Sequence, residues 1–182
     1  MDEQRILMDS DGVMRAVRRI SHEILERNKG ISNALIVGIE RRGVYLAKRL
    51  QREIESIEGV RIECESLNVA MYRDDRDYRP KQGNPCTINT TEKLIILVDD
   101  VLYTGRTIRA ALNALMDAGR PRAIQLAVLV DRGHRELPIR ADYVGKNVPT
   151  SHLENVHVNV SEVDGEDSVV LTQIEEGQQE YK

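Results

Sequence analysis

The sequence predicts an α/β protein with a central, mostly parallel sheet flanked by helices. Short apolar runs alternate with amphipathic helical segments along most of the 182 residues, as in sheets whose strands are connected by helices. The run Leu94–Val98 contains no polar residue, which is typical of a strand covered on both faces. A chain of this length, 41% hydrophobic, can bury a continuous core, so we expect a single domain over residues 1–182.

Helical and strand-like patterns alternate before this central strand. Apolar residues recur at helical spacing in 11–29 and again in 45–55, whereas alternating apolar residues favour a strand over 60–64. A buried strand is expected over 34–37, followed by a turn over 38–43 that begins and ends with glycine. Residues 72–91 then lose all periodicity, and a loop of that length is usually functional. The first half therefore supplies two helices, two strands and one long loop.

The second half continues the alternation and ends differently. A helix is expected over 107–118, with Gly119 at the position after its end and Pro121 as a stop. A strand over 124–130 precedes an irregular segment, 131–151. Alternating valines over 156–160, a turn at Asp164-Gly165 and a returning strand over 168–174 predict a C-terminal hairpin.

Composition excludes several classes of protein. No long apolar segment and no signal-peptide pattern are present, so we expect a cytoplasmic protein without a membrane-spanning part. Cys64 and Cys86 match no metal-ligand spacing, and neither a disulfide nor a zinc site is expected. The net charge of −4 argues against general affinity for nucleic acid, although it allows a local basic patch. Since Phe and Trp are absent, the core must be aliphatic and stacking on a base would depend on tyrosine.

The most informative segment is the end of the central strand and the loop after it. Asp99 and Asp100 come directly after the apolar run, where their carboxylates can accept hydrogen bonds from a diol. The loop Thr104–Thr107 precedes a helix, whose unpaired N–H groups and dipole favour an anion such as a phosphate. Two other interpretations are a magnesium or phosphoacceptor site of a receiver-like domain and an ordinary strand-loop-helix unit. A Walker loop is excluded because Gly-Lys-Ser/Thr is absent.

The string apolar-Asp-Asp-x-x-x-Thr-Gly-x-Thr resembles the phosphoribosyl diphosphate signature of the type I phosphoribosyltransferases. The resemblance implies that the acidic pair holds the ribose hydroxyls and that the loop holds the 5′-phosphate. It also implies that the turn 38–43 binds diphosphate and that Tyr72 opens a mobile loop over 72–91, whose Arg73 reaches the diphosphate on closure. The catalytic residues are then Asp99, Asp100, Arg42 and Arg73. The residues implied to bind the sugar, its phosphates and diphosphate are Arg41, Arg42, Asp99, Asp100, Val101, Leu102, Tyr103, Thr104, Gly105, Arg106 and Thr107.

The segment 131–151 narrows the resemblance to the PyrR family, whose members attenuate pyrimidine operons and act as uracil phosphoribosyltransferases. This similarity extends over nearly the whole chain, from the helix at 15–22 to the final hairpin. It implies that 131–151 forms a small hood over the base. Tyr143 would then lie against the ring, the backbone of Val144 would read its polar edge, and Asp131 and Arg132 would lie near the exocyclic groups. The other interpretation of Tyr143 is a half-buried strand aromatic.

The implied reaction converts uracil and phosphoribosyl diphosphate into UMP and diphosphate. Mg²⁺ is implied as the cofactor, with Asp99 and Asp100 acting on it indirectly, through ribose or water. Two features depart from the family pattern and leave the catalytic strength open. Glu40 and Arg41 stand where relatives have a basic residue or histidine and a threonine, and the mobile loop is shorter. Glu40 would repel diphosphate if it pointed inward, and no residue identifies itself as a general base.

A second implied activity is binding of pyrimidine-operon leader mRNA, in response to UMP or UTP. On the first helix Arg15, Arg19 and His22 fall within about 60° of one another, with Arg18 at the edge of this stripe. Arg135, Arg140 and Lys146 would extend the surface by resemblance. From composition alone, the stripe would be an ordinary solvated face.

Three alternative functions stay open beside the bifunctional one. The chain could be a salvage transferase without an RNA-binding role, a non-catalytic nucleotide sensor, or, as a weaker third choice, a purine transferase. The basic stripe distinguishes the salvage transferase from the nucleotide sensor, because a salvage enzyme has no need of such a stripe. We also expect a homo-oligomer, a dimer or larger.

Overall fold

A computed structural model describes residues 4–74 and 86–173 and places a five-stranded parallel sheet at the centre of the molecule. The strand order is β3-β2-β4-β5-β6, and every neighbouring pair is parallel. The strands of this sheet are β2 (Ala34–Ile39), β3 (Glu63–Leu67), β4 (Leu94–Leu102), β5 (Ala123–Asp131) and β6 (Tyr143–Asn147). The predicted class and the parallel sheet are therefore confirmed, and Leu94–Val98 is the buried start of the central strand.

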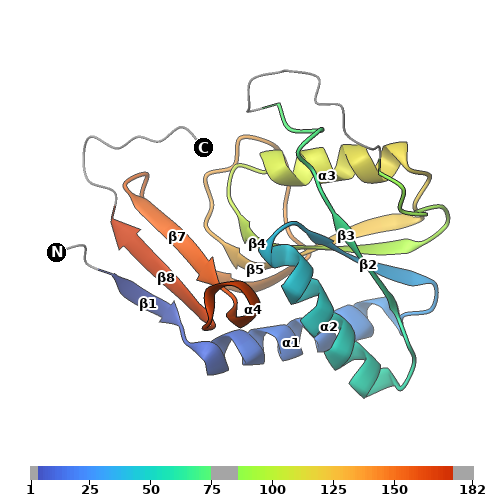
Figure 1. Cartoon of the computed structure of the whole chain (residues 1–182), viewed down its shortest axis with the longest axis horizontal. Helices are drawn as coiled ribbons and strands as arrows, with labels where there is room; N and C mark the ends of the chain where they lie inside the picture. The colour runs from blue at the N-terminus through green and yellow to red at the C-terminus, as the bar shows by residue number, and fades with distance from the viewer. Residues whose placement is uncertain (1–3, 75–85, 174–182) are drawn as a thin grey trace.

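Helices cover both faces of this sheet (Figure 1). The helices α1 (Ser10–Asn28) and α2 (Arg42–Glu58) pack together on one face, and α3 (Arg106–Asp117) packs on the other. The largest fully buried side chains among the described residues are all Ile, Leu or Val, as the lack of Phe and Trp requires. None of the described helices combines the length and apolar character that crossing a membrane requires.

A second, antiparallel sheet lies beside the first, with the order β1-β8-β7 (Figure 1). Its strands are β1 (Arg5–Met8), β7 (Glu154–Asn159) and β8 (Ser168–Gln173). The predicted hairpin is present, but the one-turn helix α4 (Ser161–Asp164) joins its strands in place of a tight turn. The sequence interpretation missed β1, because four partly exposed residues carry too little periodicity to predict a strand.

The predicted boundary between the second helix and the next strand is wrong because of capping. The helix α2 runs to Glu58 and ends at the left-handed Gly59, so Val60 lies in a bend, 51% exposed, and β3 starts later than expected. The predicted position of Gly119 is confirmed, since α3 ends at Asp117 with Ala118 as its cap and Gly119 follows, although not in a left-handed conformation. A side chain there would come within 2.8 Å of the Thr90 hydroxyl, and within 2.5 Å of the Thr91 hydroxyl, so glycine is needed for close approach.

The chain order reverses between β2 and β4, and this reversal determines where a ligand can bind. The chain after β2 leads to β3 on one side, whereas the chain after β4 leads to β5 and β6 on the other. Ligands of open parallel sheets bind at the carboxyl ends of the strands, at such a reversal. Here the two adjoining ends carry the turn before α2 and the acidic pair before α3.

We expect Gly43→Ala to destabilise the fold, because α2 begins in direct contact with β4. An added Cβ would lie 2.6 Å from the carbonyl oxygen of Val98 and 3.2 Å from the Cα of Asp99. Overpacking against backbone costs about 1–3 kcal/mol, so thermal unfolding should show a lower Tm, by about 2–4 °C for each kcal/mol.

Gly12→Ala is the matched control, since its nearest contact is the side chain of Asp9, which can move. Equal Tm values for the Gly43 variant and the native chain would contradict the tight contact.

Candidate active site at the strand reversal

The acidic pair lies within β4, near its carboxyl end. Asp99 is 7% exposed, and its Oδ1 accepts a hydrogen bond of 2.9 Å from the backbone N–H of Asp100. Asp100 is half-buried, and its Oδ1 accepts a similar bond of 2.9 Å from the N–H of Val101. Because side chains satisfy these N–H groups locally, both carboxylates are held at defined positions and keep acceptor lone pairs.

Burial of Asp99 has an electrostatic cost. Burial raises the pKa of Asp99 well above its usual value, and the negative charge of Asp100 raises it further. The positive charge of Arg73 partly opposes this shift. A site with an unfavourable buried carboxylate is suited to a ligand that donates hydrogen bonds or carries positive charge.

Two helix N-termini open onto the same edge of the sheet without side-chain caps. The helix α3 is preceded by Gly105, whose φ of 91° is a left-handed conformation that favours glycine. The helix α2 is preceded by Arg41, an exposed residue that likewise provides no cap. In contrast, Asp9 caps α1 with a bond of 2.7 Å to the N–H of Gly12. Apart from the N–H of Arg106, which donates to the Thr104 hydroxyl at 3.3 Å, the first N–H groups of α2 and α3 are therefore available to an anion.

Basic side chains accompany the turn after β2. Arg42 is the first residue of α2 and pairs with Asp164, with the charge of Asp100 also acting on it. Glu40, the residue expected to repel diphosphate if it pointed inward, instead accepts a bond of 2.7 Å from the side chain of Asn68. Because Asn68 follows β3, this carboxylate is directed toward the β3 side of the site.

The start of the predicted mobile loop lies over α3. Arg73 donates a bond of 3.3 Å to the hydroxyl of Thr107. Asp74 forms ion pairs with Arg106, at 3.4 Å, and with Arg109, at 3.1 Å. The predicted loop over 72–91 lies largely outside the described residues, at 75–85. The described part of the predicted mobile loop places Arg73 at the loop expected to hold phosphate.

The segment expected to form a hood is only partly separate from the main sheet. It completes β5, continues as a loop and returns to the sheet as β6. Within the loop, Arg135 donates to the carbonyl oxygen of Tyr103 at 2.7 Å and to that of Ile139 at 2.8 Å, and pairs with Asp131 at 2.5 Å. Arg135 thus ties this loop to the chain between the acidic pair and the phosphate loop. It is not an exposed RNA contact of the predicted kind.

The expected roles of Tyr143 and Val144 in base recognition conflict with their positions. Tyr143 is 3% exposed, and its hydroxyl donates to Gln125 at 2.6 Å under α1. In the sheet, Tyr143 lies opposite Ala127, well before the carboxyl end of β5. The carbonyl oxygen of Val144 accepts a bond of 3.1 Å from Arg19. The expectation of a stacking ring was wrong, and the buried-aromatic interpretation of Tyr143 was the better one.

Arg132 is a structural residue in this arrangement. It is 6% exposed and donates to Thr150 at 3.2 Å, to Asn155 at 3.1 Å and to the Glu154 carbonyl oxygen at 2.6 Å. Burial lowers the pKa of its guanidinium. Its hydrogen bonds support the β7 side of the site, and the expectation that it lies near the exocyclic groups of the base stays a prediction.

A cluster of rings beside the phosphate loop was missed. Tyr103, 37% exposed, stands edge-on to His134 with 5.9 Å between centroids, and Arg132 lies 4.0 Å from the Tyr103 ring. The ring of His134 in turn contacts the ring of His152, with 4.3 Å between their centroids. The chain contains only 4 His, and two of them in the segment around the hood were a signal that could have been followed.

The donor set of the site suits a hard cation that binds mainly through its ligand. Within the described residues, no group of three or more His, Cys, Asp or Glu side chains is placed to hold a metal ion. Asp99 and Asp100 retain acceptor oxygens, and Mg²⁺ commonly uses one or two carboxylates together with water and substrate phosphates. The pair therefore fits Mg²⁺ that arrives with a phosphorylated ligand.

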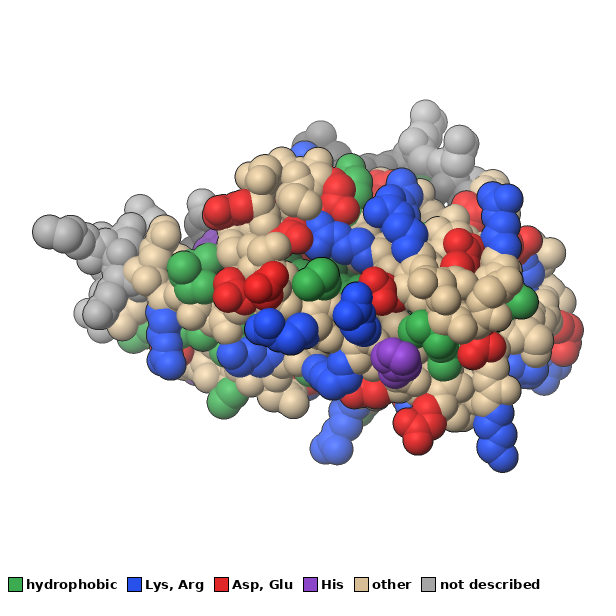
Figure 2. Space-filling view, turned by 90° about the horizontal axis from the view of Figure 1, so that it is seen from below, with side chains coloured by type: hydrophobic (Ala, Val, Ile, Leu, Met, Phe, Trp, Pro, Cys, Tyr) green, Lys and Arg blue, Asp and Glu red, His purple; other side chains and the backbone are tan. Residues whose placement is uncertain are grey.

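The predicted basic stripe lies on the exposed side of α1. Figure 2 views the molecule from this side and shows Lys and Arg side chains gathered around a His, with acidic side chains among them. Arg15 and His22 are exposed and form no hydrogen bond or ion pair with other described residues. Arg18 instead pairs with Glu53 at 3.4 Å, and Arg19 with Glu23 at 2.7 Å.

The three predicted extensions of this surface differ in their contacts. The exposed Lys146 donates to the Leu7 carbonyl oxygen at 2.7 Å, whereas Arg140 is exposed and without a described partner. Arg140 and Lys146 therefore remain accessible, and Arg135 does not.

Comparison with known proteins agrees with this geometry. Residues 4–163 match the family described as phosphoribosyl transferase domain. A protein named Bifunctional protein PyrR from Halalkalibacterium halodurans is 55% identical over 93% of this chain and 97% of its own length. The protein of the same name from Caldicellulosiruptor bescii is 56% identical over 96% of this chain and 98% of its own.

Solved structures show the same fold at much lower identity. A hypoxanthine phosphoribosyltransferase from Staphylococcus aureus has a TM-score of 0.69 at 17% identity, over 94% of this chain and 93% of that one. The Trypanosoma cruzi hypoxanthine phosphoribosyltransferase in complex with IMP has a TM-score of 0.70 at 18% identity, over 96% of this chain and 92% of that one.

Asp99→Asn should stabilise the protein at neutral pH, because the raised pKa means that the folded state disfavours the ionised carboxylate. Between the unfolded and folded pKa values the native state binds more protons, so native stability falls as pH rises through that window. Asn can keep the bond from the Asp100 N–H without a charge. We therefore expect a higher Tm for the variant than for the native chain at pH 7.5.

The difference in Tm between variant and native chain should shrink at pH 4, near the lower edge of the window. A difference that is equal at both pH values would contradict the burial effect.

Proposed function

The chain belongs to the PyrR family of proteins with a phosphoribosyl transferase domain, and we propose that it is a uracil phosphoribosyltransferase that also binds pyrimidine-operon leader RNA in response to UMP or UTP. The observation that carries the catalytic part is the meeting of the acidic pair with two uncapped helix N-termini at the reversal between β2 and β4. This arrangement presents acceptors for a diol between two sites for anions.

The sugar phosphate is held in a fixed orientation. Asp99 and Asp100 accept hydrogen bonds from the two ribose hydroxyls, and the loop from Thr104 to Thr107 binds the 5′-phosphate through hydroxyls and α3 N–H groups. Loss of diphosphate builds positive charge at the sugar C1. The nearby carboxylates stabilise that charge, and their fixed positions avoid reorganisation during the reaction.

The leaving diphosphate lies beside the turn after β2 and the N-terminus of α2. Arg42 and the exposed Arg41 provide positive charge there, and Arg73 approaches from above α3. Mg²⁺ bound with the substrate would neutralise part of the diphosphate charge, with Asp99 and Asp100 acting on it through ribose or water. No described residue is assigned as a general base.

We place the base against the rings of Tyr103 and His134. Tyr103 follows the acidic pair and precedes the phosphate loop, so a base attached to the held ribose is within reach of this cluster. Asp131 and the Arg135 bonds keep the loop that carries His134 next to Tyr103. Tyr143 takes no part in this proposal.

RNA binding uses a different surface, on the exposed side of α1. Four Arg and two Glu between residues 15 and 27 leave a local charge of +2, which attracts phosphates. Arg15, His22 and Arg140 are the side chains most available for contact, since they are exposed and without described partners. Unpaired bases of a leader loop are the expected target of sequence-specific contacts. The protein is proposed to act in the cytoplasm as a homo-oligomer.

Replacing both members of the acidic pair, Asp99→Asn with Asp100→Asn, should remove turnover while the fold survives. UMP formation from uracil and phosphoribosyl diphosphate should fall on the order of 10²-fold or more, because the ribose loses its fixed orientation. Circular dichroism and thermal unfolding report the fold. Asp117→Asn, at an exposed position at the end of α3, is the control. Retained turnover in the double variant would refute the assignment.

Arg15→Ala with His22→Ala should weaken binding of a labelled pyrimidine-leader RNA and leave UMP formation intact. A roughly tenfold loss, about 1.4 kcal/mol, and a smaller dependence of Kd on salt are expected. Arg19 is kept, because it also supports β6 through the carbonyl oxygens of Val144 and Gly145.

Arg61→Ala removes an exposed arginine from another surface and controls for net charge. Unchanged RNA affinity in the α1 variant, or an equal loss in the Arg61 variant, would count against an α1 interface. Turnover without RNA binding by the native chain would leave only the transferase.

A further inference from the structure

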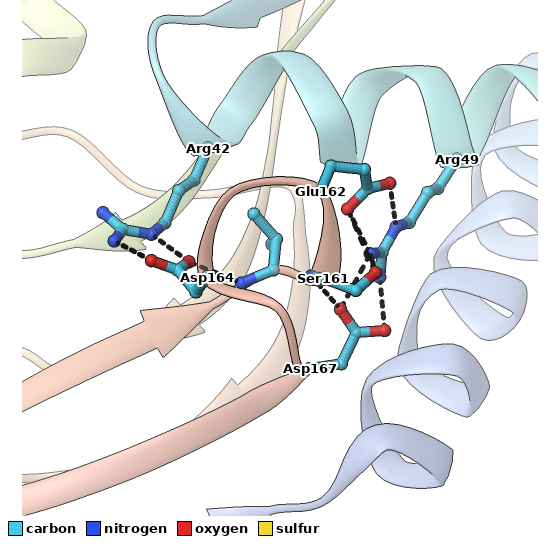
Figure 3. Close-up of polar contacts among 7 residues, drawn as sticks. Arg42, Arg49, Ser161, Glu162, Asp164 and Asp167 are labelled. Atoms are coloured by element: carbon cyan, nitrogen blue, oxygen red, sulfur yellow. Dashed lines mark hydrogen bonds and ion pairs between the residues drawn. The ribbon is translucent and has the colours of Figure 1, made fainter.

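The C-terminal turn of the molecule contacts the turn expected to bind diphosphate. The Nε of Arg42 donates to one carboxylate oxygen of Asp164 at 3.0 Å, and Nη2 donates to the other at 2.8 Å (Figure 3). The same carboxylate accepts a bond of 2.8 Å from the backbone N–H of Val160. The Arg42 bond and then the Val160 bond lower the pKa of Asp164, so it is ionised at neutral pH. A bidentate pair of this kind fixes the plane of the guanidinium group.

The turn that carries Asp164 is held by a second set of contacts. Arg49, two turns further along α2, donates to Ser161 at 3.0 Å, to Glu162 at 2.5 Å and to Asp167 at 2.7 Å (Figure 3). These bonds fasten the start of α4 and the chain just after it to α2. Because α4 is fastened at both ends, Asp164 is a fixed partner for Arg42.

We propose that Asp164 is a positioning residue that aims Arg42 at the diphosphate. This inference rests on the proposed function, in which Arg42 binds the leaving group. A guanidinium has five N–H donors, and the pair with Asp164 uses two of them. The remaining donors, including both on Nη1, form no bond with described residues and are available to a phosphate oxygen.

The position of Asp100 explains why such a partner is needed. The charge of Asp100 already acts on Arg42. Without Asp164, that attraction would draw the guanidinium toward the carboxylates that hold the ribose, where it would compete with the sugar hydroxyls. Asp164 therefore keeps Arg42 on the diphosphate side and leaves Asp100 free for ribose.

The test compares Asp164→Asn and Asp164→Ala with the native protein in the presence of Mg²⁺. Inorganic diphosphate and UMP are titrated separately by calorimetry, because UMP carries the 5′-phosphate but no diphosphate. We expect diphosphate affinity to fall about three- to tenfold, the usual contribution of immobilising one long side chain, and UMP affinity to stay within about twofold. The KM for phosphoribosyl diphosphate should rise by a similar factor, with a smaller change in kcat.

Two comparisons separate positioning from general loosening. Glu166→Gln removes a charge from the same turn at an exposed residue that contacts neither Arg42 nor Arg49, so it should leave diphosphate affinity nearly unchanged. In an Arg42→Ala background, Asp164→Asn should have no further effect, because its action passes through Arg42.

Each outcome supports or overturns the proposal. Unchanged or tighter diphosphate binding by Asp164→Asn overturns it, as does equal weakening of UMP and diphosphate or an undiminished effect in the Arg42→Ala background. If the native protein binds neither diphosphate nor UMP, the proposed function fails as well. If the native protein binds diphosphate and UMP and Asp164→Asn changes neither affinity, only the positioning role is refuted.

Discussion

The site depends on one topological constraint, the reversal of strand order between β2 and β4. Parallel strands bring their carboxyl ends to the same edge, and at the reversal two neighbouring strands lead into helices that start there. Both helix N-termini lack side-chain caps, whereas α1, which starts elsewhere, has one. The N–H groups that the fold leaves unsatisfied are thus concentrated where negatively charged groups must bind. Gly43 lets α2 begin so close to Asp99 that one ligand can contact both the N-terminus of α2 and the acidic pair.

Local signals predicted the part of the site that is continuous in sequence. The buried strand, the acidic pair and the Thr104–Thr107 loop could be read directly, since periodicity and helix-start chemistry act over a few residues. Contacts between distant segments could not. Arg42 was identified but its partner Asp164 was interpreted as part of a hairpin turn, because nothing in either segment indicates that they meet.

The errors around the hood have a related cause. Tyr143 begins a strand that was interpreted as irregular chain, so its ring was assigned to a ligand although it belongs to the core. Arg135 looked like a surface cation, yet four carbonyl oxygens and one carboxylate surround its guanidinium. Tyr143 and Arg135 are both residue types suited to ligand binding, but in the folded chain each one stabilises the structure. The α1 stripe shows the same division, with Arg19 supporting β6 and Arg15 remaining free for a partner.

The pairing of β1 with β8 has a consequence for synthesis on the ribosome. All strands of the parallel sheet have been synthesised once Asn147 is made, so the groups proposed to bind ribose and phosphate can assemble before the rest of the chain is translated. The small sheet cannot, because its first strand must wait for Ser168–Gln173, which is translated after β6. Asp164 reaches Arg42 through that same sheet. In the order of translation, the edge proposed to bind nucleotide is therefore complete before the partner of Arg42, the arginine proposed to face the leaving group, has been made.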